Sequence, residues 1–97
     1  LDRKSQFFSR SDVFVVFPGG IGTLNELIDI LTRKLLNETK KNIYLINDLS
    51  YWDPLINLFE YFEEKGFIKK KLIRKNLKIC DLNYFLENFQ LECQKLK

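Results

Sequence analysis

The chain has 97 residues, 45% of them hydrophobic, which suffices for one domain with a modest core. Its 16 basic and 13 acidic residues leave a net charge of +3, which is too small to indicate nucleic-acid binding by itself. With two cysteines, no histidine and no long apolar run, it lacks the marks of a zinc site, a disulfide-rich secreted domain and a membrane span.

The residues before the first apolar run are polar and basic, apart from Phe7 and Phe8. We expect residues 2–10 to form the last turns of a helix, which Ser11 and Asp12 would end. The chain begins with Leu rather than Met, so we expect it to be a trimmed product or a piece of a longer one.

An apolar run over residues 13–17 contains no alternating polar residues, which predicts a strand buried on both faces of a parallel sheet. Pro18 keeps that strand extended to its end. From Thr23 onward, apolar residues recur every three or four positions, which predicts a helix to about residue 36. A second apolar run over residues 43–46 predicts a parallel strand, so that strand, helix and strand form a right-handed βαβ unit.

The second half of the chain predicts two more helices and a weak strand. Asp53 and Pro54 are typical of a helix start, and this helix is expected to end in a glycine cap at Gly66. Residues 77–80 alternate weakly and predict a third strand, which a last helix follows from Asp81. The residues expected to face inward are Trp52, Leu55, Phe59 and Phe62 in the first helix, and Leu82, Phe85, Leu86 and Phe89 in the second.

Six basic residues fall within ten positions: Lys69, Lys70, Lys71, Arg74, Lys75 and Lys78. Such a run could contact a phosphate backbone or an acidic membrane surface. However, no aromatic residues interleave with the charges, as a base-stacking site would require. We therefore interpret the run as the solvated face of a short helix and loop, and we expect neither nucleic acid nor a membrane as a partner.

The order of elements predicts an α/β fold with a parallel βαβαβα sheet and flanking helices, in a single domain over residues 1–97. Open parallel sheets bind ligands beyond the carboxyl ends of their strands, which places the candidate site beside residues 19–23. A doubly wound sheet also needs strands on the other side of that crevice. We therefore expect the chain to be the C-terminal portion of such a domain, with the N-terminal half missing.

The glycines after the first strand, Gly19, Gly20 and Gly22, allow a sharp turn and a close approach to a ligand. The helix behind them presents unpaired N–H groups and a partial positive charge, so this glycine turn is a candidate anion site. A P-loop would need a Lys where Thr23 stands, and a dinucleotide fingerprint would need another glycine spacing, although Asp48 could imitate its ribose-binding acid. A single phosphate, held by backbone N–H groups and the Thr23 hydroxyl, fits the spacing.

Thr23 and Glu26 also have an ordinary explanation, because T-x-x-E is the capping box of a helix start. The residues alone leave that alternative open. If the helix start holds a phosphate, the carboxylate of Glu26 one turn further on faces the attached sugar. The two negative charges repel one another, so we expect a cation nearby.

Residues 18–26, Pro-Gly-Gly-Ile-Gly-Thr-Leu-Asn-Glu, resemble the P-G-G-x-G-T-x-x-E signature of the LOG ("Lonely Guy") family. That family comprises cytokinin riboside 5′-monophosphate phosphoribohydrolases, long misnamed lysine decarboxylases. Its R-K pair has a counterpart in Arg3 and Lys4 at the family's spacing, and residues 11–12 and 64–68 are similar as well. The resemblance implies a Rossmann-like fold and a homodimer whose sites lie near the subunit interface.

By position, the resemblance assigns the catalysis to Arg3 and Glu26 and the 5′-phosphate to the glycine turn. It implies hydrolysis of the N-glycosidic bond of AMP or a cytokinin riboside monophosphate, to free base and ribose 5-phosphate, with no cofactor or metal. Glu26 would stabilise the positive charge that grows on the ribose or orient the attacking water, and Arg3 would supply the expected cation. The implied phosphate-binding residues are Gly19, Gly20, Gly22 and Thr23.

The match to the family is not complete, because the family has an acidic residue where Asn25 stands. One alternative is a non-catalytic nucleotide- or phosphate-binding protein similar to molybdenum-cofactor carriers, and another is an inactive truncated remnant. No lysine lies in a context that suggests a pyridoxal Schiff base, which argues against lysine decarboxylation. We interpret both cysteines as reduced thiols, which predicts a cytoplasmic protein.

Overall fold

The computed structural model describes residues 6–95, with side chains described to residue 88, so the beginning of the predicted N-terminal helix lies outside the described residues. A four-stranded sheet forms the centre, with its strands in the order β1, β2, β3 and β4. The strands are β1 (Phe7–Ser9), β2 (Val13–Val16), β3 (Asn42–Ile46) and β4 (Lys78–Cys80). The helices are α1 (Ile21–Leu35), the 3₁₀ helix η1 (Asp48–Ser50), α2 (Asp53–Glu64), α3 (Leu72–Asn76) and α4 (Leu82–Lys95).

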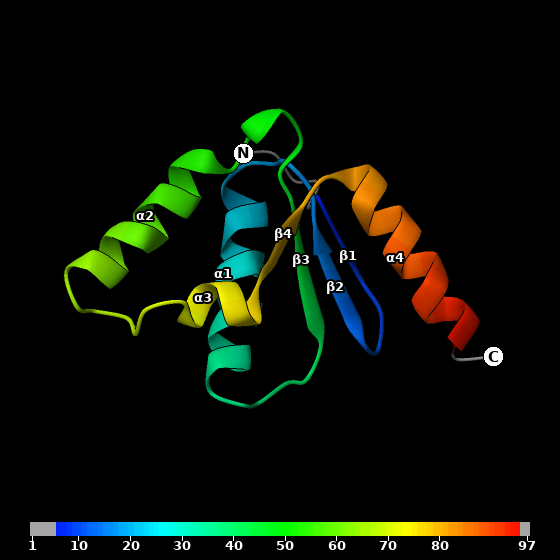
Figure 1. The fold of residues 1–97 in the computed structure, drawn as a ribbon, viewed down its shortest axis with the longest axis horizontal. Coiled ribbons are helices and arrows are strands. Elements are labelled where there is room, and N and C mark those ends of the chain that lie inside the picture. Colours follow the sequence, from blue (N-terminus) through cyan, green and yellow to red (C-terminus); the bar gives the residue numbers. More distant parts are fainter. Residues whose placement is uncertain (1–5, 96–97) are drawn as a thin grey trace.

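Three of the four strands run parallel, as the sequence predicts. β2 pairs in parallel with β3, which places Val15 beside Tyr44, and β3 pairs in parallel with β4, which places Leu45 beside Ile79. The chain passes from β2 to β3 through α1, and from β3 to β4 through α2 and α3 (Figure 1). The predicted α/β fold, with a Rossmann-like parallel sheet and flanking helices, is confirmed, and one antiparallel strand is added to it.

The segment that precedes β2 is a strand, and the prediction of a helix there is wrong for residues 7–9. β1 pairs antiparallel with β2, and the Arg10 N–H donates to the Val13 carbonyl at 2.8 Å across the intervening turn. The rings of Phe7 and Phe14 stack at a centroid distance of 5.0 Å. Adjacent aromatic residues favour a strand, and the pairing satisfies backbone groups that would otherwise be open along the edge of β2.

Both faces of β2 and β3 are buried, as their unbroken apolar runs predict. One face packs against α1, α2 and α3, and the opposite face packs against α4 (Figure 1). The first face holds the larger cluster: Phe14, Val16, Leu27, Leu31, Ile43, Leu45, Trp52, Phe59, Ile73 and Leu77. The second face holds Val13, Val15, Tyr44, Ile46 and Phe85.

α4 covers the second face of the sheet with a narrow stripe of apolar side chains. Phe85 is buried with its ring 5.0 Å from that of Tyr44, and Leu82 packs beside it, as predicted. Leu86 is 45% exposed, so its predicted inward orientation is wrong. Consecutive residues lie about 100° apart around a helix, so Leu86 turns away from the sheet when Phe85 faces it. Phe89 lies beyond the described side chains.

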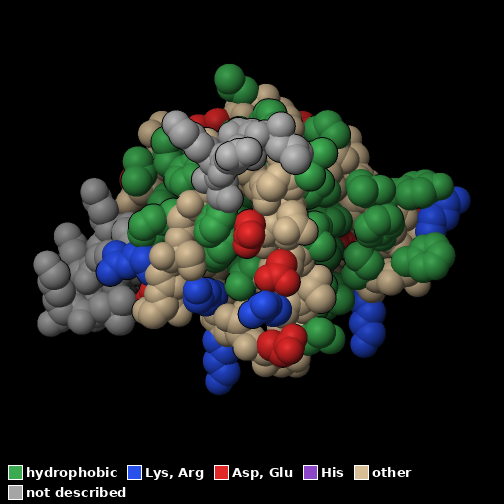
Figure 2. All heavy atoms as spheres, turned by 180° about the vertical axis from the view of Figure 1, so that it is seen from behind, with side chains coloured by type: hydrophobic (Ala, Val, Ile, Leu, Met, Phe, Trp, Pro, Cys, Tyr) green, Lys and Arg blue, Asp and Glu red, His purple; other side chains and the backbone are tan. Residues whose placement is uncertain are grey.

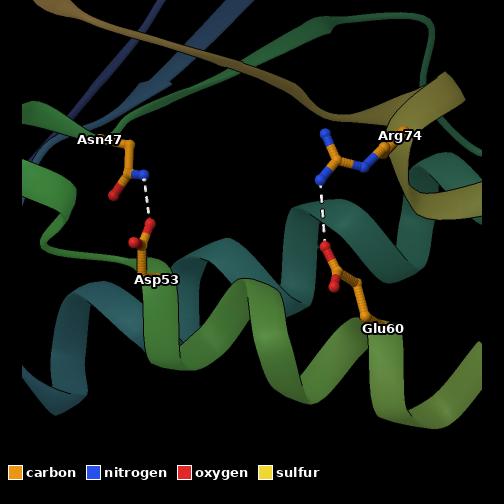
Figure 3. A network of polar contacts seen from close by, with 4 residues as sticks. All are labelled: Asn47, Asp53, Glu60 and Arg74. Carbon is orange, nitrogen blue, oxygen red and sulfur yellow. Dashed lines mark hydrogen bonds and ion pairs between the residues drawn. The ribbon is translucent and has the colours of Figure 1, made fainter.

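The six basic residues from position 69 to 78 are exposed around α3, which confirms their interpretation as a solvated face. Arg74 forms an ion pair with Glu60 of α2 at 3.1 Å (Figure 3). On the face shown in Figure 2, Lys and Arg side chains are spread out rather than gathered into one patch. Within the described residues, no helix is long and apolar enough to cross a membrane.

α2 ends in the glycine cap that the sequence predicts. Gly66 has a φ of +82°. Its N–H donates to the Glu63 carbonyl at 3.1 Å, and the Phe67 N–H donates to the Phe62 carbonyl at 2.9 Å. These two bonds form a Schellman motif, which satisfies carbonyl groups that the end of a helix leaves open.

Replacing Gly66 by Ala should lower the free energy of unfolding by about 1 kcal/mol, because left-handed backbone is strained for a residue with a Cβ. A Cβ at Gly66 meets no atom within 4 Å, so the loss reports the backbone conformation alone. Urea denaturation measures it, and Gly66→Asn should recover part of the loss because Asn tolerates this conformation. Equal stability of Gly66→Ala and the wild type would contradict the explanation.

Candidate functional site

The candidate site is the glycine turn between β2 and α1, beyond the carboxyl end of a central strand. In Figure 1 this turn, η1 and the start of α4 lie along the same upper edge of the sheet. The loops that follow β2, β3 and β4 therefore meet at the edge where open α/β sheets bind ligands. The structure brings five predicted site residues together on this turn and the first turns of α1: Gly19, Gly20, Gly22, Thr23 and Glu26.

Gly19 lies where the chain after β2 comes closest to α1. A Cβ on Gly19 would lie 2.3 Å from Thr23 Oγ1 and 3.1 Å from Gln6 Cβ, so only glycine fits without a shift of its neighbours. A Cβ on Gly20, by contrast, would meet no atom within 4 Å, and both Gly20 and Gly22 are exposed. The glycine turn is therefore tightly packed at Gly19 and open to a ligand at Gly20 and Gly22.

Thr23 does not cap α1, and the capping-box alternative is wrong. The helix begins at Ile21 with Gly20 as its N-cap, and no side chain caps it. Thr23 is 2% exposed, and its Oγ1 accepts a hydrogen bond from the Gln6 N–H at 3.1 Å. The helix starts earlier than predicted because the Gly20 carbonyl already accepts a hydrogen bond from the Leu24 N–H at 3.0 Å.

The start of α1 thus presents a set of open donors. The first N–H groups of a helix have no carbonyl partner within it, and among the described residues no side chain caps them. The helix dipole adds about half a positive charge at the same place. Thr23 is buried and its Oγ1 accepts from the Gln6 N–H, so the open donors at this helix start are backbone N–H groups. This arrangement suits an anion with several acceptor oxygens, such as phosphate.

Glu26 is half-buried on α1, four residues after Gly22. Within the described part of the chain, no ion pair or hydrogen bond reaches its carboxylate. The ion pair on this helix lies further along, where Asp29 Oδ2 and Arg33 Nε are 3.2 Å apart. Arg3, the predicted catalytic partner, lies outside the described residues, so its pairing with Glu26 stays a prediction.

Tyr51 is a residue of this site that sequence reasoning missed. It lies in the loop after β3, and its hydroxyl donates a hydrogen bond to the Gly19 carbonyl. The side chain is 49% exposed, and its ring meets that of Trp52 edge-on at a centroid distance of 5.0 Å. Its position just after the carboxyl end of a strand that neighbours β2 is the signal that could have found it.

Asn47 and Asp48 hold the loop after β3 in place. Asn47 Oδ1 accepts from the Trp52 N–H at 2.6 Å, and its Nδ2 donates to Asp53 Oδ1 at 2.8 Å (Figure 3). The Asp48 carboxylate accepts a hydrogen bond from the Leu82 N–H at 2.9 Å, at the start of α4. Because this carboxylate joins two loops, the structure disfavours the alternative in which Asp48 binds a ribose.

Among the described residues, two ionisable groups have shifted pKa values, and neither lies in the glycine turn. Burial raises the pKa of the Cys80 thiol, and the nearby charges of Asp81 and Asp48 raise it further. Burial, together with the charge of Lys78, lowers the pKa of Lys34. A thiol with a raised pKa is a weak nucleophile at neutral pH, so Cys80 is a poor candidate for covalent catalysis.

Two hollows of the described surface lie away from the glycine turn. One of about 470 Å³ lies between η1 and the start of α4. The other, of about 530 Å³, lies at the end of α2 and is lined by Tyr61, Phe62, Lys65, Phe67 and Ile68. Neither includes a residue of the glycine turn. In the part of the chain that is described, no group of three or more His, Cys, Asp or Glu could hold a metal ion.

Comparison with known proteins identifies one family and several relatives. A family model described as possible lysine decarboxylase matches residues 1–86. A probable cytokinin riboside 5′-monophosphate phosphoribohydrolase of Oryza sativa subsp. japonica is 40% identical over 68 residues, which cover 70% of this chain and 30% of the relative. The LOG phosphoribohydrolase of the same organism is 34% identical over 67 residues, covering 69% of this chain and 28% of the relative.

A bacterial relative gives a similar match. The cytokinin riboside 5′-monophosphate phosphoribohydrolase of Rhodococcoides fascians is 36% identical over 66 residues, which cover 68% of this chain and 33% of the relative. The chain therefore spans about a third of the length of the curated relatives it matches.

Gly19→Ala should lower the free energy of unfolding by about 1 to 3 kcal/mol, because overpacking forces its neighbours to move. The clash expected is with Thr23 Oγ1, which lies 2.3 Å from the added Cβ. Gly20→Ala is the matched control, since its Cβ meets no atom within 4 Å, and its loss should be smaller. Thermal unfolding compares the two. Equal losses would show that contact with Thr23 is not what requires a glycine at position 19.

Proposed function

This chain belongs to the LOG family, the family described as possible lysine decarboxylase, and we propose that it carries the phosphate-binding turn of a nucleoside 5′-monophosphate phosphoribohydrolase. The reaction is hydrolysis of the N-glycosidic bond of AMP or a cytokinin riboside 5′-monophosphate, which releases the free base and ribose 5-phosphate. One observation carries the proposal: the uncapped start of α1 follows the glycine turn, and the Glu26 carboxylate lies one turn further on. The names of the relatives support it.

The 5′-phosphate is assigned to the start of α1. Its oxygens would accept hydrogen bonds from the open N–H groups around Gly20 and Gly22, and the helix dipole would offset its negative charge. The family resemblance adds Thr23 to this set; its side chain is buried beneath the turn, where its oxygen accepts a hydrogen bond from the Gln6 N–H. The exposure of Gly20 and Gly22 supports this assignment, and among the described residues no atom lies within 4 Å of a Cβ built on Gly20.

The chemistry is assigned to Glu26. As the bond between C1′ and the base breaks, its electron pair leaves with the base and positive charge grows on the ribose ring. A fixed carboxylate facing that ring stabilises the charge and takes a proton from the attacking water. The water oxygen bonds to C1′, and the proton passes to the departing base. Arg3 supplies the positive charge that two neighbouring anions, phosphate and carboxylate, require.

Lysine decarboxylation, the activity in the family's description, has less support. A Schiff-base lysine needs a lowered pKa and a place beside its cofactor. The pKa of Lys34 is lowered, but Lys34 is separated from the start of α1 by about 20 Å along the helix axis. The proposed phosphate site and this lysine are therefore too far apart to serve one cofactor.

We also propose a cytoplasmic homodimer, in which this chain forms part of a Rossmann-like domain. The family resemblance supports the dimer, and the free thiol of Cys80 supports a reducing compartment. The donors of the glycine turn account for the phosphate end of a nucleotide only. The base would therefore contact residues beyond those described, from the rest of the protein or from a second subunit.

AMP should raise the melting temperature of the full-length protein, whereas adenosine should not, because the site is assigned to the 5′-phosphate. A ligand at 100 times its Kd stabilises a protein by about 2.7 kcal/mol, which is several degrees. Differential scanning fluorimetry with AMP, adenosine and inorganic phosphate at millimolar concentrations measures the shifts. The absence of a shift with both phosphate-bearing ligands would indicate an inactive remnant.

Glu26→Gln should slow the release of free base from AMP and from isopentenyl-AMP by about 100-fold or more. The amide keeps the shape of the side chain but can neither take a proton nor carry a negative charge. Chromatography of the released base measures the rate in the full-length protein. Glu64→Gln, which changes an exposed carboxylate on α2, is the matched control and should keep the rate.

Two outcomes would contradict this assignment. An unchanged rate in Glu26→Gln would mean that the carboxylate has no catalytic role. Tight binding of AMP by the wild type without any release of base would instead favour a non-catalytic nucleotide-binding protein.

A further inference from the structure

We propose that Tyr51 is a positioning residue that selects the phosphate-binding orientation of the peptide between Gly19 and Gly20. The inference rests on the proposed function, because it concerns the same phosphate site. It starts from the hydrogen bond that the Tyr51 hydroxyl donates to the Gly19 carbonyl across the gap between two loops.

The phenol of Tyr51 is held by the core of the protein. Its ring packs edge-on against Trp52, which is only 6% exposed and belongs to the larger hydrophobic cluster. The backbone N–H of Trp52 in turn donates to Asn47 Oδ1 at 2.6 Å. Asn47 is tied to the neighbouring strand, because its N–H donates to the Cys80 carbonyl at 2.8 Å. The Tyr51 hydroxyl that contacts Gly19 therefore belongs to a side chain held in place by the core.

The loop before Tyr51 has an unfavourable backbone that brings this side chain into place. Leu49 and Ser50 both have left-handed conformations, with φ values of 57° and 58°. This conformation costs free energy in a residue with a side chain. Leu49 is fully exposed, so packing of its own side chain does not explain the cost. This turn redirects the chain so that the Tyr51 side chain can reach the Gly19 carbonyl.

The peptide that Tyr51 contacts is free to turn unless something holds it. Gly19 is pressed against Thr23 and cannot shift, whereas Gly20 has open space around its Cα. Rotation of the peptide between two glycines meets little steric resistance. In a planar trans peptide, the carbonyl of the first residue and the N–H of the second point in opposite directions. One orientation therefore presents an N–H group to an anion, and the other presents a carbonyl oxygen.

The hydrogen bond from Tyr51 decides between these orientations. With the Gly19 carbonyl bound to the phenol, the Gly20 N–H points away from Tyr51 and joins the open donors at the start of α1. With the peptide turned over, a carbonyl oxygen would face the phosphate and repel it. Tyr51 thus keeps an acceptor out of a site that needs donors.

Tyr51→Phe in the full-length protein tests this role, because it removes the hydroxyl and keeps the ring against Trp52. The affinity for AMP and for inorganic phosphate should fall about three- to ten-fold, the worth of one hydrogen bond. In the hydrolysis assay the loss should appear as a raised KM for AMP with kcat retained. Loss of the same hydrogen bond should lower the melting temperature without ligand by no more than a few degrees. Tyr61→Phe, at an exposed tyrosine of α2, is the matched control and should change neither affinity nor KM.

Isothermal titration calorimetry measures these affinities, and it does not depend on turnover. Unchanged affinity for AMP and phosphate in Tyr51→Phe would overturn the inference. A fall in kcat without a change in KM would overturn it too, because it would place the hydroxyl in the chemical step. If the wild type binds AMP but releases no base, while Tyr51→Phe binds AMP more weakly, the proposed hydrolysis fails and the positioning role stands.

Discussion

The close packing of Gly19 on Thr23 is the constraint on which the candidate site depends. A Cβ at Gly19 would lie 2.3 Å from the Thr23 hydroxyl oxygen, so the chain can come this close only without a side chain. The same contact allows the Gln6 N–H to reach that hydroxyl at 3.1 Å. Any separation of β2 from α1 would move the open N–H groups at the helix start away from the edge of the sheet.

The buried sheet determines where this contact lies. Helices cover both faces of β2 and β3, which leaves the ends of the strands as the places where loops can meet a ligand. At the carboxyl edge the loops support one another: Tyr51 bonds to Gly19, and Asp48 bonds to Leu82 at the start of α4. The glycine turn is thus braced by Tyr51 of the loop after β3, and Asp48 ties that loop to the start of α4.

The charges of the proposed site need a partner that the described residues do not provide. A phosphate at the start of α1 and the carboxylate of Glu26 have the same sign, and only the phosphate is offset by N–H donors and the helix dipole. Among the described residues no ion pair reaches Glu26, and Arg33, further along α1, is paired with Asp29 at 3.2 Å. Arg3 is the residue that the family resemblance offers for this role.

The sequence by itself determined the layered fold and the place of the glycine turn between β2 and α1. Unbroken apolar runs must be covered on both faces, and clustered glycines before a helix leave its first donors open. The tertiary structure alone decided three further features, because each depends on residues that are distant in the chain. Residues 7–9 became a strand by pairing with β2, and Thr23 is buried where α1 packs against Gly19 and Gln6. Tyr51 meets Gly19 across 32 positions, and no local pattern encodes such a contact.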